Sequence, residues 1–316
     1  MKNRAIVTGG AGFIGSHLVD RLIWMGFDVL VIDNLSTGSR DNLNSEAEFL
    51  YKDIRDRDID SIMKDYSPDY IFHLAAQIDV RKSLKDPIWD ENINIQGTLN
   101  LLNAVSRMRI KKFIFSSTGG AIYGEAKNAV EEQLPEPSSP YAIGKLTCEH
   151  YLRVYFRWKG VPFSALRYGN VFGPRQDPYG EAGVVAIFCG QLLGGERPVL
   201  YGFGKMIRDY VYVSDIVHAN ILAMEKGEGG IYNIGSGKPT SVNELFSILK
   251  RISGRDIKPK YADPREGEIQ EIYLNPEKAS RELGWAPKIT LDDGLNKTYK
   301  WFEKNLSCKG NLCQNS

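Results

Sequence analysis

The chain has 316 residues, 42% of them hydrophobic and 25% charged, which is an ordinary globular composition with enough length for about two domains or one large one. Its 40 Lys and Arg residues balance 39 Asp and Glu residues, and a formal charge of +1 argues against nucleic acid or a membrane surface as a partner. No apolar run approaches the roughly 18 residues of a membrane span, and no secretory leader precedes the first predicted strand, so we expect a cytoplasmic protein.

The first predicted element is a short apolar strand, which runs into a glycine-rich loop and then a helix. Gly10, Gly12 and Gly15 fit the dinucleotide fingerprint, in which glycines permit a tight turn, close approach of backbone to pyrophosphate, and packing of helix on strand. The same spacing also occurs in ordinary strand-to-helix turns. The next apolar run, 29–32, ends in Asp33, which lies 18 residues after Gly15. An acidic side chain there can accept hydrogen bonds from both ribose hydroxyls and would repel a 2′-phosphate, so we predict NAD rather than NADP.

Strands and helices alternate through the rest of the first half of the chain. Apolar strands are expected over 49–51, 70–74 and 112–116, and helices over 55–66, 94–107 and 141–158. This alternation is typical of βαβ units with parallel strands. We therefore predict an α/β protein with a Rossmann-like, doubly wound parallel sheet. His73 falls at the end of one strand, and we interpret it as a structural residue.

The second half differs in composition from the first and is predicted to form a smaller α/β substrate-binding domain. Gly and Pro are frequent over 169–204, helices are expected over 184–193 and 214–224, and strands over 209–213 and 231–234. Ser241 and Thr290 resemble the first residues of capping boxes. Asn275 is followed by a proline at the expected first position of a helix.

We assign residues 1–168 to an NAD-binding domain and residues 169–316 mainly to a substrate-binding domain, with the part near 205–235 returning to the first. Only the last eight or so residues look disordered. The four cysteines are interpreted as free thiols, with a zinc site or a disulfide in the tail as the alternative. They are Cys148, Cys189, Cys308 and Cys313. No resident metal is expected.

Tyr141 and Lys145 stand in a Tyr-x-x-x-Lys spacing, which places them one turn apart on the same face of a predicted helix. An ammonium beside a tyrosine favours the phenolate and lowers the tyrosine pKa from about 10, so that the phenol can take or give a hydroxyl proton. Thr118, 23 residues earlier at a strand end, can hydrogen-bond the same substrate oxygen. The spacing alone arises by chance in many helices, but together with the glycine loop and Asp33 it predicts a hydride-transfer site.

In these residues the chain resembles the extended short-chain dehydrogenases/reductases, and most closely the family of UDP-glucose (UDP-galactose) 4-epimerases. The resemblance runs from Thr8 to about Trp285. It implies a homodimer formed through two long helices of each subunit, over 94–107 and 141–158. The matching motifs are Thr8-Gly-Gly-Ala-Gly-Phe-Ile-Gly-Ser16, Asp33-Asn34, Asp53-Ile54, His73-Leu-Ala-Ala76, Asn94 before Gly97-Thr98, Ser116-Ser-Thr118, Tyr123-Gly124, Tyr141-Ala-Ile-Gly-Lys145, Arg167-Tyr-Gly-Asn170, Gly173-Pro-Arg175, Arg208-Asp-Tyr210 and Asp215.

The resemblance implies a role for each matching residue. Tyr141 is implied as the base for the sugar 4-hydroxyl, Thr118 as its helper, and Lys145 as the partner of the tyrosine and a ligand of the nicotinamide ribose. The implied cofactor-binding residues are Gly9, Gly12, Phe13, Ile14, Gly15, Asp33, Asn34, Ser36, Thr37, Gly38, Asp53, Ile54, Leu74, Ala75, Ala76, Gln77, Asn94, Ser116, Ser117, Tyr141, Lys145 and Tyr168. The implied substrate-binding residues are Thr118, Tyr141, Asn170, Gly183, Val184, Val185, Tyr201, Arg208, Arg265 and Glu268.

Two features of the substrate side leave alternatives open. Arg208 and Arg265 match family positions that neutralise the diphosphate, but each could instead form a surface ion pair with the acid that follows it, Asp209 or Glu266. Ile272 aligns with a family position that limits bulk at the sugar C2. Large aromatic residues there exclude an N-acetyl group and small residues admit it, and isoleucine decides neither.

The function that the resemblance implies is 4-epimerisation of UDP-galactose and UDP-glucose. Hydride passes from the sugar C4 to NAD while Tyr141 takes the hydroxyl proton, the 4-keto sugar turns about its diphosphate, and the hydride returns to the opposite face. The 4-epimerases of UDP-N-acetylglucosamine and UDP-glucuronate are close alternatives. A net oxidoreductase or dehydratase is disfavoured, since family dehydratases carry Asp-Glu after the threonine where this chain has Gly119-Gly120. A non-catalytic NAD-binding regulator would not need the intact Thr118, Tyr141 and Lys145.

Overall fold

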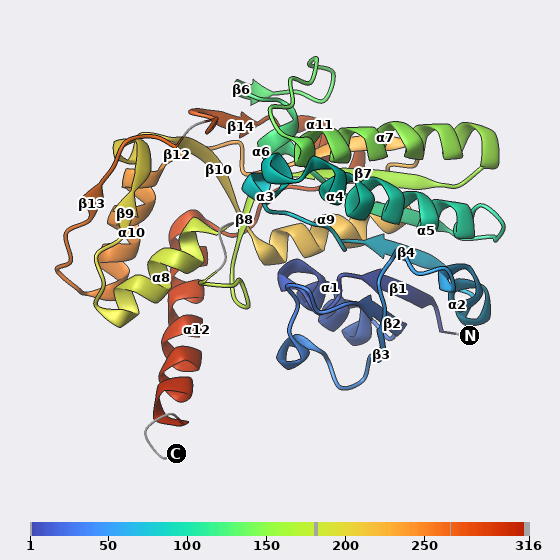
Figure 1. Cartoon of the computed structure of the whole chain (residues 1–316), viewed down its shortest axis with the longest axis horizontal. Coiled ribbons are helices and arrows are strands. Elements are labelled where there is room, and N and C mark those ends of the chain that lie inside the picture. The colour runs from blue at the N-terminus through green and yellow to red at the C-terminus, as the bar shows by residue number, and fades with distance from the viewer. Residues whose placement is uncertain (1, 180–182, 266, 313–316) are drawn as a thin grey trace.

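The computed structural model describes residues 2–179, 183–265 and 267–312, and it is organised around a sheet of seven parallel strands (Figure 1). The strands are β1 (Arg4–Thr8), β2 (Asp28–Asp33), β3 (Glu48–Tyr51), β4 (Tyr70–His73), β5 (Lys112–Thr118), β7 (Phe163–Tyr168) and β11 (Gly230–Ile234). Their order is β11-β7-β5-β4-β1-β2-β3, so the winding of the chain reverses between β1 and β4. The predicted Rossmann-like, doubly wound sheet is confirmed. In such sheets ligands bind at the switch point, beyond the carboxyl ends of the strands.

Helices cover both faces of this sheet because its strands are apolar on both faces. One layer consists of α1 (Phe13–Trp24), α9 (Val213–Glu225) and α11 (Glu277–Leu283), and the other of α2 (Ile59–Tyr66), α5 (Gly97–Val105) and α7 (Pro140–Lys159). The first layer packs on Val7 and Phe72, and the second packs on Ile6 and Phe113. Successive residues of a strand point to opposite faces, which is why Ile6 and Val7 belong to different cores. Figure 1 shows α5 and α7 on the side of the sheet opposite to α1.

A second region lies beyond the β8 and β10 side of the molecule, to the left in Figure 1. It contains β8 (Asn170–Phe172), β10 (Ile207–Tyr212) and β12 (Pro239–Ser241) in one sheet, the pair β9 (Val199–Leu200) and β13 (Lys260–Tyr261), and the pair β6 (Ala126–Ala129) and β14 (Ile272–Leu274). Its helices are α8 (Val184–Gly194), α10 (Val242–Ser253) and α12 (Leu291–Leu312). They pack around Phe172, Leu200 and Leu245. By contrast, β11 and α9 belong to the central sheet and its helical layer.

Short helical elements connect these parts and differ in places from the predicted boundaries. They are η1 (Arg40–Asn42), α3 (Val80–Lys85), α4 (Pro87–Glu91), the π-helix η2 (Asn92–Gln96), α6 (Gly119–Ile122) and η3 (Tyr201–Gly204). The helix predicted over 55–66 begins only at Ile59, since Asp53 accepts the N–H of Arg55 and Asp56 accepts that of Asp53. Such local bonds offer the backbone an alternative to the helix.

Caps define the helices of the second region. Ser241 forms a complete capping box with Glu244 at the start of α10, as predicted. Thr290 accepts the N–H of Asp293, also as predicted. The side chain of Asn275 accepts the N–H of Glu277, so α11 starts one residue later than expected from the proline. The helix α12 continues to Leu312, so residues 309–312 are helical where we expected disorder, and 313–316 lie outside the described residues.

Cys148 and Cys189 are buried free thiols. The side chain of Cys308 and all of Cys313 lie outside the described residues. Within the described ranges no group of His, Cys, Asp and Glu residues could hold a metal ion. No helix in those ranges is both long and apolar enough to cross a membrane.

Candidate active site

The loop between β1 and α1 lies closer to neighbouring backbone than a side chain would allow. A Cβ on Gly15 would collide with the carbonyl oxygen of Gly9, and a Cβ on Gly9, whose φ is +72°, would lie 2.6 Å from the backbone nitrogen of Ala75. The helix α1 begins after Gly12 without a side-chain cap and without an acidic residue in its first turn. The unpaired N–H groups and dipole of such a helix end favour an anion. The residues present therefore fit the pyrophosphate of a dinucleotide at the switch point of the sheet.

Asp33 ends β2 beside this loop, and its side chain is almost fully buried. Its Oδ2 accepts the N–H of Ala11 at 3.0 Å, and its Oδ1 accepts the N–H of Leu35 at 2.8 Å. Burial raises the pKa of Asp33, and these two hydrogen bonds oppose that shift. The loop that follows returns to the glycine loop, since a Cβ on Gly38 would lie 3.0 Å from the Cβ of Ala11. The carboxylate is thus held in one orientation, although its binding of ribose stays a prediction.

Asp53, one of the implied cofactor-binding residues, already has partners within the protein. The Arg55 guanidinium donates to both of its oxygens at 2.8 Å, and the Asn34 amide donates at 2.8 Å. The hydrogen bond from Arg55 is the main reason why the pKa of Asp53 falls to about 2. Arg55 was missing from the predicted cofactor-binding residues. The Asp-x-Arg pattern after the third strand was the signal in the sequence that could have identified it. Ile54, between them, is buried beneath Gly97.

The loop over 74–77, after β4, is held by Asn94. Its Oδ1 accepts the N–H of Gln77 at 2.9 Å, and its Nδ2 donates to the Gln77 carbonyl at 3.0 Å. Asn94 lies in the π-helix η2, an irregularity frequent at functional sites. His73 before this loop is bonded to two threonine hydroxyls at 2.8 and 2.9 Å, and burial lowers its pKa to about 3. It is a neutral structural residue, as interpreted from the sequence.

Tyr141, Lys145 and Thr118 come together where β5 ends against α7. The Thr118 hydroxyl lies near the Tyr141 phenol and acts to lower the pKa of that phenol. The Lys145 ammonium donates to the carbonyl of Ser116 at 2.8 Å. Ser139 caps the amino end of α7, which places Tyr141 and Lys145 in its first two turns with their side chains toward the strand end. A hydroxyl, a phenol and an ammonium are therefore gathered at the carboxyl edge of the central sheet.

Burial dominates the electrostatics of these side chains. It raises the pKa of Tyr141 to about 12, although the Thr118 hydroxyl opposes the shift. It also lowers the pKa of Lys145 to about 8. The prediction that Lys145 lowers the tyrosine pKa is thus wrong for the protein alone. The Lys145 ammonium is bonded to a backbone carbonyl and is not among the groups that shift the tyrosine pKa, which burial dominates.

The Ser117 side chain points from β5 toward α7, on the face of the strand opposite to that of Thr118. Its hydroxyl donates to Glu149 at 2.6 Å, and Arg167 forms a two-point ion pair with the same carboxylate at 2.9 and 2.6 Å. Arg167 also donates to Tyr123 at 2.6 Å. The Ser117 side chain is therefore committed to a buried polar network rather than open to a cofactor. Glu149 was missed in the sequence, and its position one turn after Lys145 was the available signal.

Arg208, on the predicted substrate side, is bonded to backbone. Its guanidinium donates to the carbonyls of Ile207 and Ile269 at 2.9 and 2.6 Å. The alternative of an ion pair with Asp209 is wrong, since that carboxylate is buried and accepts the N–H and hydroxyl of Ser236, each at 2.6 Å. Arg208 is thus a fixed cation at the junction between β10 and the segment before β14.

Arg265 and Glu268 lie on this same segment. The Arg265 guanidinium carbon stacks 3.7 Å from the centre of the Tyr201 ring. Oε2 of Glu268 is buried and has no hydrogen-bond partner within the described residues, and its charge acts on Arg208. The alternative partner of Arg265, Glu266, lies outside the described residues. Two guanidinium groups suit a diphosphate, and a carboxylate oxygen without a partner suits a hydroxyl of the sugar attached to that diphosphate.

The remaining predicted substrate residues lie along β8 and at the start of α8. Asn170 opens β8 next to the strand end of Thr118, since a Cβ on Gly120 would lie 3.3 Å from its Oδ1. Gly183 begins α8 without a side-chain cap, Val184 is partly exposed, and Val185 is buried in the core of the second region. A role of Val185 would therefore involve its backbone.

Several residues named from the family likeness are enclosed by packing. The Tyr168 side chain is buried, and its phenol is bonded to Asn220 at 2.8 Å. Ile272 is 1% exposed and packs with Tyr123 and Leu274. Ile14, at the start of α1, packs against the cores of both regions. Ile272 thus presents almost no surface to a ligand, and its role as a gate at C2 stays a prediction.

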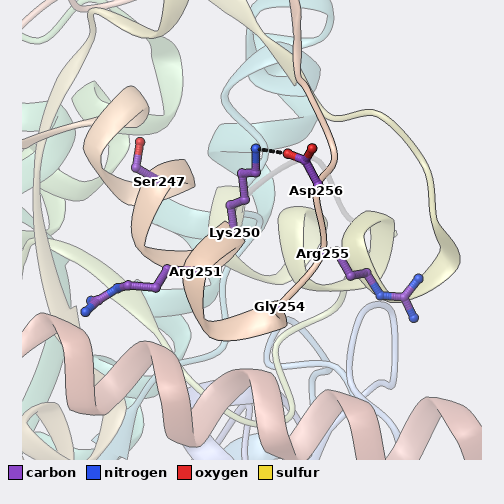
Figure 2. A pocket seen from close by; sticks show the side chains of 6 residues that line it. All are labelled: Ser247, Lys250, Arg251, Gly254, Arg255 and Asp256. Atoms are coloured by element: carbon purple, nitrogen blue, oxygen red, sulfur yellow. Dashed lines mark hydrogen bonds and ion pairs between the residues drawn. The ribbon is translucent and has the colours of Figure 1, made fainter.

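A hollow of about 380 Å³ lies elsewhere, at the carboxyl end of α10 (Figure 2). Its charged side chains are largely paired: Lys250 is bonded to Asp256 at 2.6 Å, and Arg251 is paired with Asp292. Figure 2 shows the Lys250 and Asp256 side chains pointing toward one another across the hollow. Because these charges are satisfied within the protein, the hollow does not compete with the cluster at the sheet edge as the functional site.

Comparison with known proteins places this geometry in context. The model of the NAD dependent epimerase/dehydratase family matches residues 5–235. A putative UDP-glucose 4-epimerase of Methanocaldococcus jannaschii is 46% identical over 303 residues, which covers 95% of this chain and 98% of that protein. A UDP-glucose 4-epimerase of Thermotoga maritima, solved with UDP-glucose, is 50% identical with a TM-score of 0.94, covering 96% of this chain and 99% of that one. A UDP-N-acetylglucosamine 4-epimerase of Methanobrevibacter ruminantium, solved with UDP-N-acetylmuramic acid, is 40% identical with a TM-score of 0.91, covering 96% and 100%.

Proposed function

The chain belongs to the NAD dependent epimerase/dehydratase family, and we propose that it is an NAD-dependent 4-epimerase that interconverts UDP-galactose and UDP-glucose. The observation that carries this proposal is the meeting of Thr118, Tyr141 and Lys145 at the carboxyl edge of the same parallel sheet that carries the glycine loop. The 4-epimerases of UDP-N-acetylglucosamine and UDP-glucuronate stay as alternatives. The Methanobrevibacter relative keeps the first of them open.

The chemistry at C4 is divided between the cofactor and three side chains. NAD supplies the acceptor and later the donor of hydride, and its oxidised ring adds a positive charge that favours the phenolate. Tyr141 takes the proton of the 4-hydroxyl and returns it when the ketone is reduced. Thr118 holds the same oxygen through its hydroxyl, and Lys145, bonded to the Ser116 carbonyl, supplies an ammonium next to the tyrosine.

The nucleotide is anchored apart from the sugar. We assign the diphosphate to Arg208 and Arg265, with the Tyr201 ring beneath the second guanidinium, and a ribose hydroxyl to the open acceptor of Glu268. The 4-keto sugar has to turn over between the two hydride transfers, so binding energy belongs on the nucleotide rather than on the hexose. We assign residues 1–168 to cofactor binding and 169–316 mainly to the UDP-sugar.

Dehydration is disfavoured by the residues after Thr118. The acid and base that dehydratases of the family carry would fall on Gly119 and Gly120. A Cβ on Gly119 would lie 2.6 Å from a methyl carbon of Leu274, so an acidic side chain there would have to displace packed hydrophobic residues. We therefore propose an isomerase that regenerates its NAD in each turnover, acting in the cytoplasm.

The reaction is tested by proton NMR of the purified protein with UDP-galactose and, separately, with UDP-N-acetylgalactosamine, with no NAD added. We expect the anomeric signal of UDP-glucose to appear from the first substrate. Conversion of both would mean that the sugar pocket also admits an acetamido group. If neither is converted, even after NAD is supplied, the proposal for these hexoses fails, and UDP-glucuronate is the next substrate to try.

A homodimer is proposed on the exposed apolar face formed by α4 and α7. This α4–α7 face carries Ile88, Trp89, Ile143, Val154 and Trp158. The two helices lie against each other, and Ile143, Val154 and Trp158 follow one side of α7 because they are spaced by near-whole helical turns. Such a face on a lone subunit is a marker of an interface. It lies on the layer that contains α5 and α7, in accord with the helices implied by the family resemblance.

Replacing Trp158, which is 83% exposed, with Lys is expected to convert the dimer to a monomer. A charge in place of a buried aromatic anchor costs at least about 2 kcal/mol, which is roughly a thirtyfold weaker association. Analytical ultracentrifugation at micromolar concentration measures the change. Trp24→Lys is the control, because Trp24 is 74% exposed on α1 in the opposite layer. A wild-type protein that sediments as a monomer contradicts the proposed dimer.

A further inference from the structure

Asp90, in α4, is a buried carboxylate that the roles described so far do not use. Its side chain is 0% exposed. Its Oδ1 accepts the Gln77 side-chain amide at 2.6 Å and the Asn94 amide at 3.3 Å, whereas its Oδ2 has no hydrogen-bond partner within the described residues. A buried carboxylate oxygen without a partner lowers stability. Its presence therefore calls for a reason outside stability.

The carboxylate faces the catalytic helix. A Cβ placed on Gly144 would lie 3.8 Å from Oδ2 of Asp90, so this oxygen faces α7 at the residue before Lys145. The side of α7 that meets α4 carries no side chain at Gly144, which permits this approach. The negative charge of Asp90 acts on both Lys145 and Tyr141: it raises the pKa of each.

The other charged groups around Lys145 are neutral or offset. On α7, burial raises the pKa of Cys148 to about 11, so its thiol is uncharged near neutral pH. Glu149 on the same helix is engaged by the two-point ion pair with Arg167 from β7. His73 from β4 is neutral, since its pKa is about 3. Among the described groups that act on the lysine, Asp90 is the anion left without a cation of its own.

We propose that Asp90 is the counter-charge of Lys145 and a positioning residue of the hydride-transfer site. The lysine needs its ammonium form to assist Tyr141, and this buried position would otherwise favour the neutral amine. The same carboxylate accepts the amide of Gln77, so it also ties the loop after β4 to α4, the helix that packs against the catalytic helix α7. The inference rests on the proposed function for the role of Lys145, and its geometry is independent of the identity of the sugar.

The test is a titration of Lys145 by NMR in the NAD-loaded enzyme labelled with ¹³C-lysine. Its signal is assigned by its disappearance in Lys145→Arg, and its midpoint is compared between wild type and Asp90→Asn. Loss of an anion disfavours the ammonium, so the midpoint is expected to move to lower pH by about 1 unit. The matched control is Glu91→Gln, since Glu91 follows Asp90 in α4 but is exposed, and its midpoint should equal that of wild type. An unchanged midpoint in Asp90→Asn overturns the proposal.

Further variants separate this role from a structural one. Asp90→Glu keeps the charge and is expected to restore the wild-type midpoint. If Asp90→Asn fails to fold, Asp90→Ser replaces it, since a hydroxyl still accepts from the Gln77 amide. In UDP-galactose turnover, we expect the alkaline limb of the kcat–pH profile of Asp90→Asn to lie at lower pH than that of wild type. KM should be nearly unchanged. A shifted midpoint in a protein without epimerase activity would leave this inference standing and refute only the proposed function.

Discussion

Replacing Tyr141 with phenylalanine is expected to lower kcat by about 10²–10⁴-fold, the usual contribution of a positioned general acid or base. The substitution removes only the phenolic oxygen, so the packing of α7 and the nucleotide-binding side should persist and KM should change little. The loss has a clear origin in the structure, where the half-buried phenol lies beside Thr118 at the end of β5. Proton NMR of UDP-galactose conversion measures the rate.

The matched control is Tyr155→Phe, on the same helix. Its phenol also donates a hydrogen bond, to Asn103 at 2.6 Å, but it lies away from the strand end. We expect kcat of Tyr155→Phe to stay within about twofold of wild type, as for a surface substitution. If Tyr141→Phe keeps more than a tenth of the wild-type kcat, the phenol does not carry the proton and another group must.

The second large effect is expected in stability. Glu149→Gln should lower the free energy of unfolding by about 3–5 kcal/mol, because it leaves the guanidinium of Arg167 buried without an anion. Glu149 and Arg167 are 1% and 3% exposed, and their ion pair also supports Ser117 and Tyr123. Such a loss is a large share of the roughly 5–15 kcal/mol of a typical protein. Urea unfolding followed by circular dichroism measures it.

Glu132→Gln is the control for this prediction, with the same substitution in an exposed ion pair. Glu132 lies 3.2 Å from Lys278, and its side chain is 71% exposed. Exposed pairs contribute about 0–1 kcal/mol, so its urea midpoint should stay close to that of wild type. Equal stabilities of Glu149→Gln and Glu132→Gln would mean that the buried pair does no more than a surface pair.

The fold was accessible from the sequence because its signals are local. Parallel strands buried on both faces read as short apolar runs, and the alternating helices have apolar stripes and caps such as Ser241 with Glu244. The glycine spacing and Asp33 predicted the cofactor side, and the structure holds that carboxylate beside the loop. The helix start at Ile59 was missed because it depends on side-chain bonds of Asp53 and Asp56 that compete with the helix.

The sequence by itself determined the parallel sheet, the dinucleotide loop and the Tyr141 and Lys145 spacing, since each of these follows from the order of neighbouring residues. Only the tertiary structure decided the electrostatics. Burial raises the pKa of Tyr141 where the spacing predicted a decrease, and Asp90 reaches α7 through the packing of a separate helix. Burial and through-space charge depend on which distant segments pack together, and hydrophobic periodicity does not specify that packing.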